Sequence, residues 1–200
     1  MPADIVLLIP AAGSSSRMAP HDKLLEPIDG VPLLRRQVMM ALRTGCDVLV
    51  TLSPDHPARR AALSGISDGR LHLQEVPEAA EGIAASIRRG AAWAESRRAS
   101  GLMVVLADMP DLDAADLNLM LQGFDLKTVC RAVDEAGTPG HPVVFPADLL
   151  PALKRLSGDQ GARAILRSER VMHIQLPGTH ATTDLDTPEA WATWRARSGR

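Results

Sequence analysis

The sequence predicts a doubly wound α/β fold, in which a mostly parallel sheet carries helices on both faces. Two observations lead to this prediction. Short apolar runs of strand length recur along the chain, and stretches with apolar residues at helical spacing separate them. Strands that alternate with helices form parallel sheets that are buried on both faces. With 200 residues, of which 46% are hydrophobic, the chain is long enough to bury one such core. We therefore expect one domain over residues 1–200.

Four strands, each followed by a helix, are expected in the first part of the chain. Each expected strand ends in a turn rich in Gly, Pro, Ser or acidic residues. The strands are residues 5–9, 47–52, 71–76 and 102–107. The helices are residues 32–43, 57–63, 83–97 and 113–121, the last with Asp113 as its N-cap. In the first three helices the apolar residues define one face, and the arginines are expected on the opposite, solvated face.

Beyond residue 121 the pattern changes to a hairpin and short helices. Two antiparallel strands flank a turn rich in Gly and Pro, then two short helices, a strand and a last helix follow. The expected strands are residues 128–133, 142–145 and 171–176, and the helices are residues 146–156, 161–168 and a segment that starts near Thr187 and Pro188. We expect this part, roughly residues 125–170, to be a small β-rich insertion on the carboxyl-terminal side.

Composition and charge exclude several classes of protein. The 22 basic and 24 acidic side chains give a net charge of −2, which is too balanced for a protein that coats nucleic acid or an anionic membrane. Cys46 and Cys130 are far apart, so neither a disulfide framework nor a zinc site is expected. The apolar run 5–9 is too short to cross a bilayer, and Asp4 stands where a signal peptide needs positive charge. We expect a cytoplasmic protein with neither a nucleic-acid nor a membrane partner.

The loop after the first expected strand has the composition of an anion site. It reads Pro-Ala-Ala-Gly-Ser-Ser-Ser-Arg-Met over residues 10–18. Small residues let the backbone turn with its N–H groups pointing inward, and Arg17 and Lys23 can close over an anion held there. The spacing is neither that of a Walker A loop nor that of a dinucleotide fingerprint. By these residues alone, a phosphate site and an ordinary surface turn both remain open.

Acidic residues stand at two places where a cation bound to phosphate would be needed. Asp108 follows the fourth expected strand, and Asp184 and Asp186 alternate near the other end of the sequence. In an extended chain, residues two apart point the same way. Each acid also has a structural interpretation: Asp108 can close a turn or cap the helix over 113–121, and Asp186 or Thr187 can cap the last helix.

Several motifs together resemble the MobA/MocA-like nucleotidyltransferase family, in particular its molybdenum cofactor cytidylyltransferase branch. Two departures stand out: Ala19 follows Met18 where the family usually has glycine, and Ala84 replaces a serine. The motifs are loop 10–18, Lys-Leu-Leu at 23–25, Gly-x-Pro-Leu-Leu at 30–34, the segment 82–90, Asp-Met-Pro at 108–110, Gly-His-Pro at 140–142, segment 157–163 and Asp-x-Asp-Thr-Pro-Glu at 184–189. The resemblance spans residues 5–190 and implies a Rossmann-type fold like that of the nucleotide-diphospho-sugar transferases.

The resemblance also implies a reaction and a set of site residues. The reaction is a Mg²⁺-dependent transfer of CMP from CTP to the phosphate of a molybdopterin-type acceptor, with release of pyrophosphate. Arg17 and Lys23 are the implied catalytic residues, because they would stabilise the leaving pyrophosphate. The implied metal ligands are Asp108 and Asp184, with Asp186 as the alternative to Asp184. The implied nucleotide-binding residues are Ala11, Ala12, Gly13, Ser14, Ser15, Ser16, Arg17, Lys23, Gly82 and Ser86, and the acceptor-binding residues are His141, Asp159 and Arg163.

Three alternatives to this assignment stay open. The preference for CTP rests on Ala11-Ala12-Gly13, where guanylyltransferase relatives tend to read Ala-Gly-Gly, so GTP is the competing donor. A sugar phosphate or methylerythritol phosphate is the competing acceptor. The third alternative is a non-catalytic accessory protein that binds the cofactor and delivers it to a molybdenum hydroxylase, which is also the expected recipient of the enzyme's product.

Overall fold

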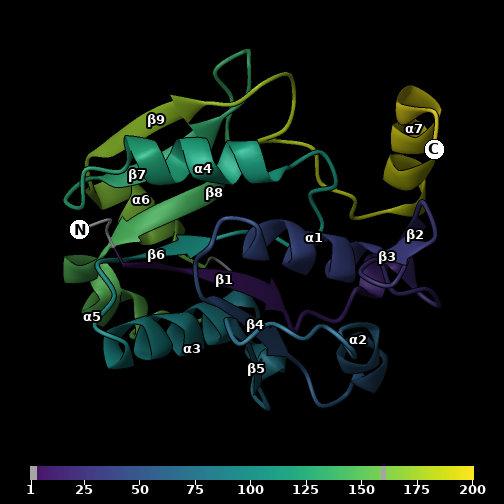
Figure 1. Ribbon diagram of the computed structural model, residues 1–200, viewed down its shortest axis with the longest axis horizontal. Coiled ribbons are helices and arrows are strands. Elements are labelled where there is room, and N and C mark those ends of the chain that lie inside the picture. The colour runs from purple at the N-terminus through teal and green to yellow at the C-terminus, as the bar shows by residue number, and fades with distance from the viewer. Residues whose placement is uncertain (1–3, 159–160) are drawn as a thin grey trace.

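The computed structural model describes residues 4–158 and 161–200, and in these residues the chain folds around one seven-stranded sheet (Figure 1). The sheet order is β5-β4-β1-β6-β8-β7-β9. Its strands are β1 (Ile5–Ala11), β4 (Val48–Leu52), β5 (Leu71–Glu75), β6 (Gly101–Val104), β7 (Val129–Val133), β8 (Pro139–Pro146) and β9 (Val171–Gln175). The α-helices are α1 (Leu33–Leu42), α2 (Pro57–Ala62), α3 (Ile83–Ser96), α4 (Ala114–Gly123), α5 (Leu150–Leu153), α6 (Arg163–Ser168) and α7 (Pro188–Ser198).

The strand pairing confirms the predicted doubly wound, mostly parallel sheet. β1 pairs in parallel with β4 and β6, β4 with β5, and β7 with β9. β8 is antiparallel to both of its neighbours, β6 and β7. The hairpin expected after residue 121 forms, and its strands extend the main sheet. None of the helices in the described ranges combines the length and the apolar character needed to cross a membrane.

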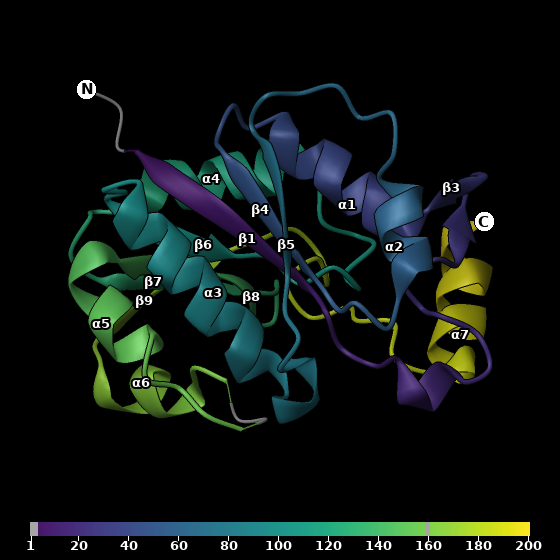
Figure 2. The same ribbon diagram turned by 90° about the horizontal axis from the view of Figure 1, so that it is seen from below.

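The sheet is the middle of three layers, because its residues point alternately to two apolar faces. In β1, Ile5, Leu7 and Ile9 belong to one apolar cluster, and Val6 and Leu8 belong to the other. Helices α1 and α4 cover the first side of the sheet, and α3 and α5 cover the second (Figure 2). Helix α3 lies so close to β1 that a Cβ atom on Gly90 would come within 2.5 Å of the Leu8 side chain. This close packing holds the middle of α3 on β1, and the contact of Ala85 with Ala12 brings the amino-terminal end of α3 near the carboxyl end of β1.

A separate apolar cluster attaches the last helix to the segment that follows loop 10–18. Met18 ends a 3₁₀ turn, η1 (Ser16–Met18), and packs in this cluster with Leu185 and both tryptophans of α7. The short strands β2 (Pro27–Ile28) and β3 (Val31–Pro32), which the sequence did not predict, pair beside it. Trp194 also donates a hydrogen bond from Nε1 to Asp111, at 2.7 Å. Residues from opposite ends of the sequence are therefore held together here.

The caps of two helices decide which acidic residues remain available. Asp113 caps α4 as predicted, forming a reciprocal pair of bonds with the first turn through Asp116. Thr187 caps α7 by accepting a hydrogen bond from the amide of Ala190. Asp108 and Asp186 therefore serve neither helix as a cap, and their carboxylates are left for other contacts.

Candidate active site

A cavity of about 600 Å³, here called the first cavity, opens at the carboxyl ends of β1, β4 and β6. Its volume lies in the usual range of small-molecule sites, and the carboxyl ends of parallel strands are where such sites form. Of the predicted nucleotide-binding residues, only Ser16 does not line it. Those that line it are Ala11, Ala12, Gly13, Ser14, Ser15, Arg17, Lys23, Gly82 and Ser86, and they are joined by Asp108, Asp184 and Asp186.

Loop 10–18 turns sharply at the carboxyl end of β1. Ser15 has a left-handed backbone, with φ at 53°, which costs a residue other than glycine about 1 kcal/mol or more. In the described part of the chain, the amides of Ala12, Gly13 and Ser14 find no hydrogen-bond acceptor. Backbone amides normally have a hydrogen-bond partner in the folded protein. Because these three face an open cavity, they are available to donate hydrogen bonds to a bound anion. The geometry fits the predicted anion site.

The amino-terminal end of α3 forms the opposite wall of the first cavity. Gly82 precedes the helix with φ at 92°, a conformation that favours glycine. Ser86 follows one turn into the helix and is only 3% exposed, so it faces the cavity and not bulk solvent. The positive end of the helix dipole is directed at the same space, which favours a negatively charged ligand.

Two cations and two carboxylates meet at one end of this cavity. The Lys23 Nζ atom lies 2.5 Å from Asp108 Oδ2 and also contacts Asp186, which in turn pairs with Arg17 at 2.7 Å. Burial lowers the pKa of Lys23, but the two carboxylates outweigh burial and raise it. Burial raises the pKa of Asp186, and Lys23 and Arg17 outweigh that effect and lower it. Lys23 and Asp186 are therefore both charged near neutral pH.

A third carboxylate, Asp184, lies beside this group. The amide of Leu185 donates to the carbonyl of Asp108 at 3.0 Å, and the Leu185 side chain is buried in the cluster of α7. Asp184 and Asp186 thus both turn toward the first cavity, as their alternation predicts. Burial raises the pKa of Asp184, and the negative charges of Asp186 and Asp108 raise it further. A divalent cation would relieve this repulsion.

The acidic residues fit a hard divalent cation. The Asp108 Oδ1 atom is buried and has no hydrogen-bond partner in the described part of the chain, and carboxylate oxygen is the ligand that Mg²⁺ prefers. Within residues 4–158 and 161–200, no three His, Cys, Asp or Glu side chains gather tightly enough to form a complete metal cage. Such sites commonly take two protein carboxylates and complete the shell with water and substrate phosphate.

A second cavity, of about 440 Å³, adjoins the first. Ile83, Leu106 and Asp184 line both, so the two spaces meet beside the carboxylates. The second cavity lies between β8, α6 and the segment before α7, and most of the residues that line it are of apolar type. Of the predicted acceptor-binding residues, His141 and Arg163 line it, and Asp159 lies outside the described residues.

Apart from Asp184, which it shares with the first cavity, the charged side chains among the described residues that line the second cavity are the arginines Arg131 and Arg163. Arg131, on β7, donates to the carbonyls of Gly140 and Pro139 at 3.0 and 3.3 Å. Burial and then the charge of Arg131 lower the pKa of His141 to about 4, so its imidazole is neutral at pH 7. His141 Nδ1 is buried without a partner among the described residues. These groups suit an anionic ligand with an apolar body.

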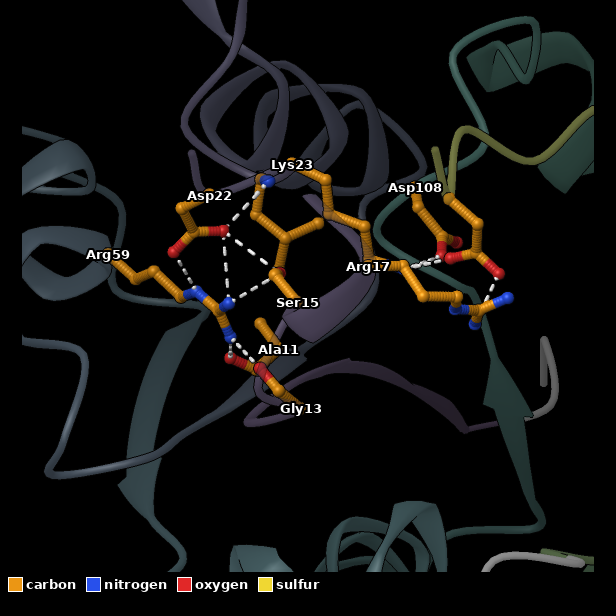
Figure 3. Close-up of polar contacts among 10 residues, drawn as sticks. Ala11, Gly13, Ser15, Arg17, Asp22, Lys23, Arg59 and Asp108 are labelled. Carbon is orange, nitrogen blue, oxygen red and sulfur yellow. Dashed lines mark hydrogen bonds and ion pairs between the residues drawn. The ribbon is translucent and has the colours of Figure 1, made fainter. Parts of the chain in front are cut away.

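Arg59 was predicted on the solvated face of its helix, and that prediction is wrong. Its side chain is 0% exposed and reaches from α2 under loop 10–18, between Asp22 and the carbonyls of Ala11 and Gly13 (Figure 3). A buried guanidinium requires a counter-ion and acceptors for its five N–H groups, and this site supplies both. Helical periodicity alone could not reveal it, because Asp22 is 37 residues away in sequence.

Arg131 also escaped the sequence-based prediction. It lies within an expected strand, but the face that a strand residue occupies depends on register, and the register of β7 shifts between Arg131 and Val133. The one available signal was a basic residue in the hairpin strand that pairs with the Gly-His-Pro segment.

A loop with free amides, a helix amino terminus, clustered carboxylates and a second adjoining cavity are typical of an α/β protein that binds anionic ligands. The MobA-like NTP transferase domain matches residues 7–174, which include most of the sheet and most residues that line the two cavities, but not Asp184 and Asp186. The chain belongs to this family, whose members are nucleotidyltransferases.

Individual relatives agree with this assignment. The purine catabolism protein PucB of Bacillus subtilis is 30% identical over 193 residues, which cover 90% of this chain and 91% of PucB. A probable molybdenum cofactor guanylyltransferase of Natronomonas pharaonis is also 30% identical, over 91% of this chain and 92% of its own. The protein Rv0371c of Mycobacterium tuberculosis, crystallised in complex with manganese, is 25% identical with a TM-score of 0.75, and the alignment covers 95% of this chain and 97% of that one.

Proposed function

We propose that this protein transfers CMP from CTP to the phosphate of a molybdopterin-type acceptor and releases pyrophosphate. The observation that carries the proposal is the meeting of two cavities beside Asp184: one has the loop, the cations and the helix end that a triphosphate needs, and the other has apolar walls with Arg131 and Arg163. A donor and an acceptor held in these spaces would have their phosphates close together, which lowers the entropic cost of reaction.

In the proposed reaction, an oxygen of the acceptor phosphate attacks the α-phosphorus of the triphosphate in line. A new P–O bond forms, the bond to the β-phosphate oxygen breaks, and pyrophosphate leaves with the electron pair. The protein contributes positioning and electrostatic stabilisation, because a phosphate monoester is already a sufficient nucleophile. Lys23 and Arg17 would exchange their carboxylate partners for the oxygens of the leaving pyrophosphate.

Asp108 and Asp184 are the residues that we propose hold Mg²⁺. The unpartnered Oδ1 atom of Asp108 and the raised pKa of Asp184 both favour a cation there. The manganese complex of the relative Rv0371c supports a divalent cation in this family. When bound, Mg²⁺ would neutralise charge on the phosphates as they rearrange.

The choice of CTP rests on Ala11-Ala12-Gly13 in the loop that lines the first cavity. Ala12 is buried with Val76 and Ala85, which fixes the position of the loop, whereas a glycine there would allow a closer approach to a larger purine. The relative named a guanylyltransferase makes GTP the principal competitor.

The test is an assay of pyrophosphate release with Mg²⁺ and each of the four triphosphates. Each triphosphate is paired in turn with molybdopterin, molybdenum cofactor, a sugar phosphate and methylerythritol phosphate. Turnover with CTP and the molybdenum cofactor is expected to dominate. Dominant use of GTP would overturn the base assignment, and faster turnover with another phosphate would overturn the acceptor. Tight binding of the cofactor without pyrophosphate release would favour the non-catalytic accessory protein.

A further inference from the structure

We infer that Arg59 is a positioning residue that aims the backbone amides of loop 10–18 at the phosphates of the nucleotide. The inference deepens the proposed function and rests on it, since it concerns how the same cavity holds a triphosphate. The observation behind it is that one fully buried side chain binds two carbonyls, one hydroxyl and one carboxylate of the same loop region. Each partner lies between 2.6 and 3.0 Å from a guanidinium nitrogen.

The first step concerns the peptide groups that Arg59 holds. Its Nη1 atom donates to the carbonyl of Ala11 at 2.7 Å and to that of Gly13 at 2.6 Å. In a trans peptide group the C=O and the following N–H point in opposite directions. Fixing these two carbonyls on Arg59 therefore turns the amides of Ala12 and Ser14 away from the guanidinium. Both residues line the first cavity, so their N–H groups are directed toward it.

The second step concerns electrostatics. A positive charge at the oxygen of a peptide group draws electron density from its nitrogen, so the N–H becomes a stronger donor. Asp22 accepts hydrogen bonds from Nε and Nη2 of Arg59, at 2.7 and 3.0 Å, and balances the buried charge. Burial raises the pKa of Asp22, but Arg59 outweighs burial and holds it below its usual range. The loop thus presents oriented amides above a neutral pair, and the ligand does not meet a bare cation.

The third step concerns the strained residue of the loop. The Ser15 hydroxyl accepts a hydrogen bond from Arg59 at 2.8 Å and donates one to Asp22 at 3.1 Å. These bonds offset the cost of its left-handed backbone and hold the turn in one conformation. A lysine at position 59 could not replace them, because an ammonium group is a single point with three donors, whereas the guanidinium is a planar fork with five.

The experiment compares Arg59→Lys with Arg60→Lys, a matched change on the next residue of α2, where the arginine is half-exposed and pairs with Glu75. Triphosphate affinity is measured by calorimetry with CTP and with GTP in the presence of Mg²⁺ and without acceptor. Arg59→Lys is expected to bind the preferred triphosphate at least about 10-fold more weakly, as befits the loss of charge-assisted contacts. In the full assay the KM for triphosphate rises while the KM for acceptor stays within about twofold. Arg60→Lys should change neither.

Asp22→Asn keeps the experiment decisive if Arg59→Lys does not fold. This variant retains a side chain of the same size that can still accept from Arg59, and we expect it to fold and to weaken triphosphate binding several-fold. Hydrogen exchange at the amides of residues 12–15 provides a second measurement and is expected to become faster in the variant, with exchange in β1 and α3 unchanged.

The outcomes separate the inference from the proposed function. Variants that fold, bind triphosphate as tightly as the wild type and show unchanged exchange in loop 10–18 would overturn the inference alone. A wild-type protein that binds triphosphate but releases no pyrophosphate with any acceptor would overturn the proposed function alone. A wild-type protein that binds no triphosphate would overturn both.

Discussion

The two adjoining cavities hold their charges in opposite ways. In the first, Lys23, Arg17 and Arg59 are each paired with a carboxylate, and the pairs join segments that are far apart in sequence. In the second, Arg131 donates to backbone carbonyls, and the neighbouring charge of Arg163 lowers its pKa after burial does so. The first cavity is therefore arranged before a ligand arrives, whereas the second still has cationic groups to satisfy. This difference agrees with the proposal that the nucleotide binds in the first cavity and the acceptor in the second.

The largest expected effect tests the charged end of the first cavity. Asp108→Asn removes the negative charge that holds Lys23 and would hold the cation, so kcat/KM for nucleotidyl transfer should fall about 10³-fold, the upper range for loss of one electrostatic group. The measurement is pyrophosphate release at saturating Mg²⁺. Asp148→Asn, on the exposed turn before α5, is the matched control and should retain activity. A fully active Asp108→Asn protein would remove this residue from the site.

The next prediction concerns stability and tests the neutral imidazole of the second cavity. The pKa of His141 in the folded protein is about 4, whereas an unfolded histidine titrates near 6.5. Below pH 6.5 the unfolded chain gains a proton that the folded chain does not, so stability should fall as the pH drops from 6.5 to 4. The loss approaches about 3 kcal/mol when complete.

Urea denaturation at pH 7, 5.5 and 4.5 measures this loss. His141→Gln should flatten the dependence on pH, whereas His173→Gln, at an exposed position on β9, should leave it as in the wild type. If the free energy of unfolding falls with pH equally in the wild type and in His141→Gln, the imidazole is not held in its neutral form.

A smaller effect is expected from Arg131 in the second cavity, whose guanidinium donates to backbone carbonyls and pairs with no carboxylate among the described residues. Arg131→Met keeps the aliphatic stem and removes the guanidinium, so the KM for the acceptor should rise by about 10- to 30-fold, the worth of a hydrogen bond to a charged group. The KM for triphosphate should not change, because Arg131 does not line the first cavity. Steady-state kinetics with each substrate varied in turn separates the two values. An equal change in both would mean that the cavities are not independent.

The smallest effect concerns the base. Ala12→Gly removes the methyl group that packs on Val76 and Ala85, and the ratio of kcat/KM for GTP to that for CTP should rise by about 5-fold. Competition between the two triphosphates measures this ratio directly. Ala41→Gly, which removes a buried methyl group on α1 outside this cavity, controls for lost stability and should leave the ratio unchanged. An unchanged ratio in Ala12→Gly would mean that Ala12 does not discriminate between the two bases.

The features that could be predicted from the sequence share one physical property: the placement of each residue follows from the pattern of its near neighbours in the chain. Apolar runs located β1, β4, β5 and β6, and the alternation of Asp184 and Asp186 around a buried Leu185 directed both carboxylates to one side. The cap at Asp113 follows from side-chain chemistry within one turn. The composition of loop 10–18 likewise made an anion site a candidate without knowledge of the rest of the fold, with an ordinary surface turn as the alternative.

The features that sequence reasoning missed depend on distant partners. Arg59 has the same helical position as a solvent-facing arginine, and only the approach of Asp22 makes its burial favourable. The pairing of β2 with β3 involves two residues on each side, too few for a periodic signal. β8 begins at Pro139, three residues before its predicted start, because pairing to β7 continues past the register shift at Arg131.

The attachment of the last helix has a consequence for the order in which this protein becomes active during synthesis. Loop 10–18 leaves the ribosome long before residues 184–194, whereas a domain generally folds as one unit. Asp184 and Asp186 reach the first cavity only when the Leu185 amide meets Asp108 and Trp194 docks on Asp111. A nascent chain therefore contains loop 10–18 long before it contains the two carboxylates that line the same cavity. Activity should appear abruptly, when the segment around residues 184–194 has been made and has folded back.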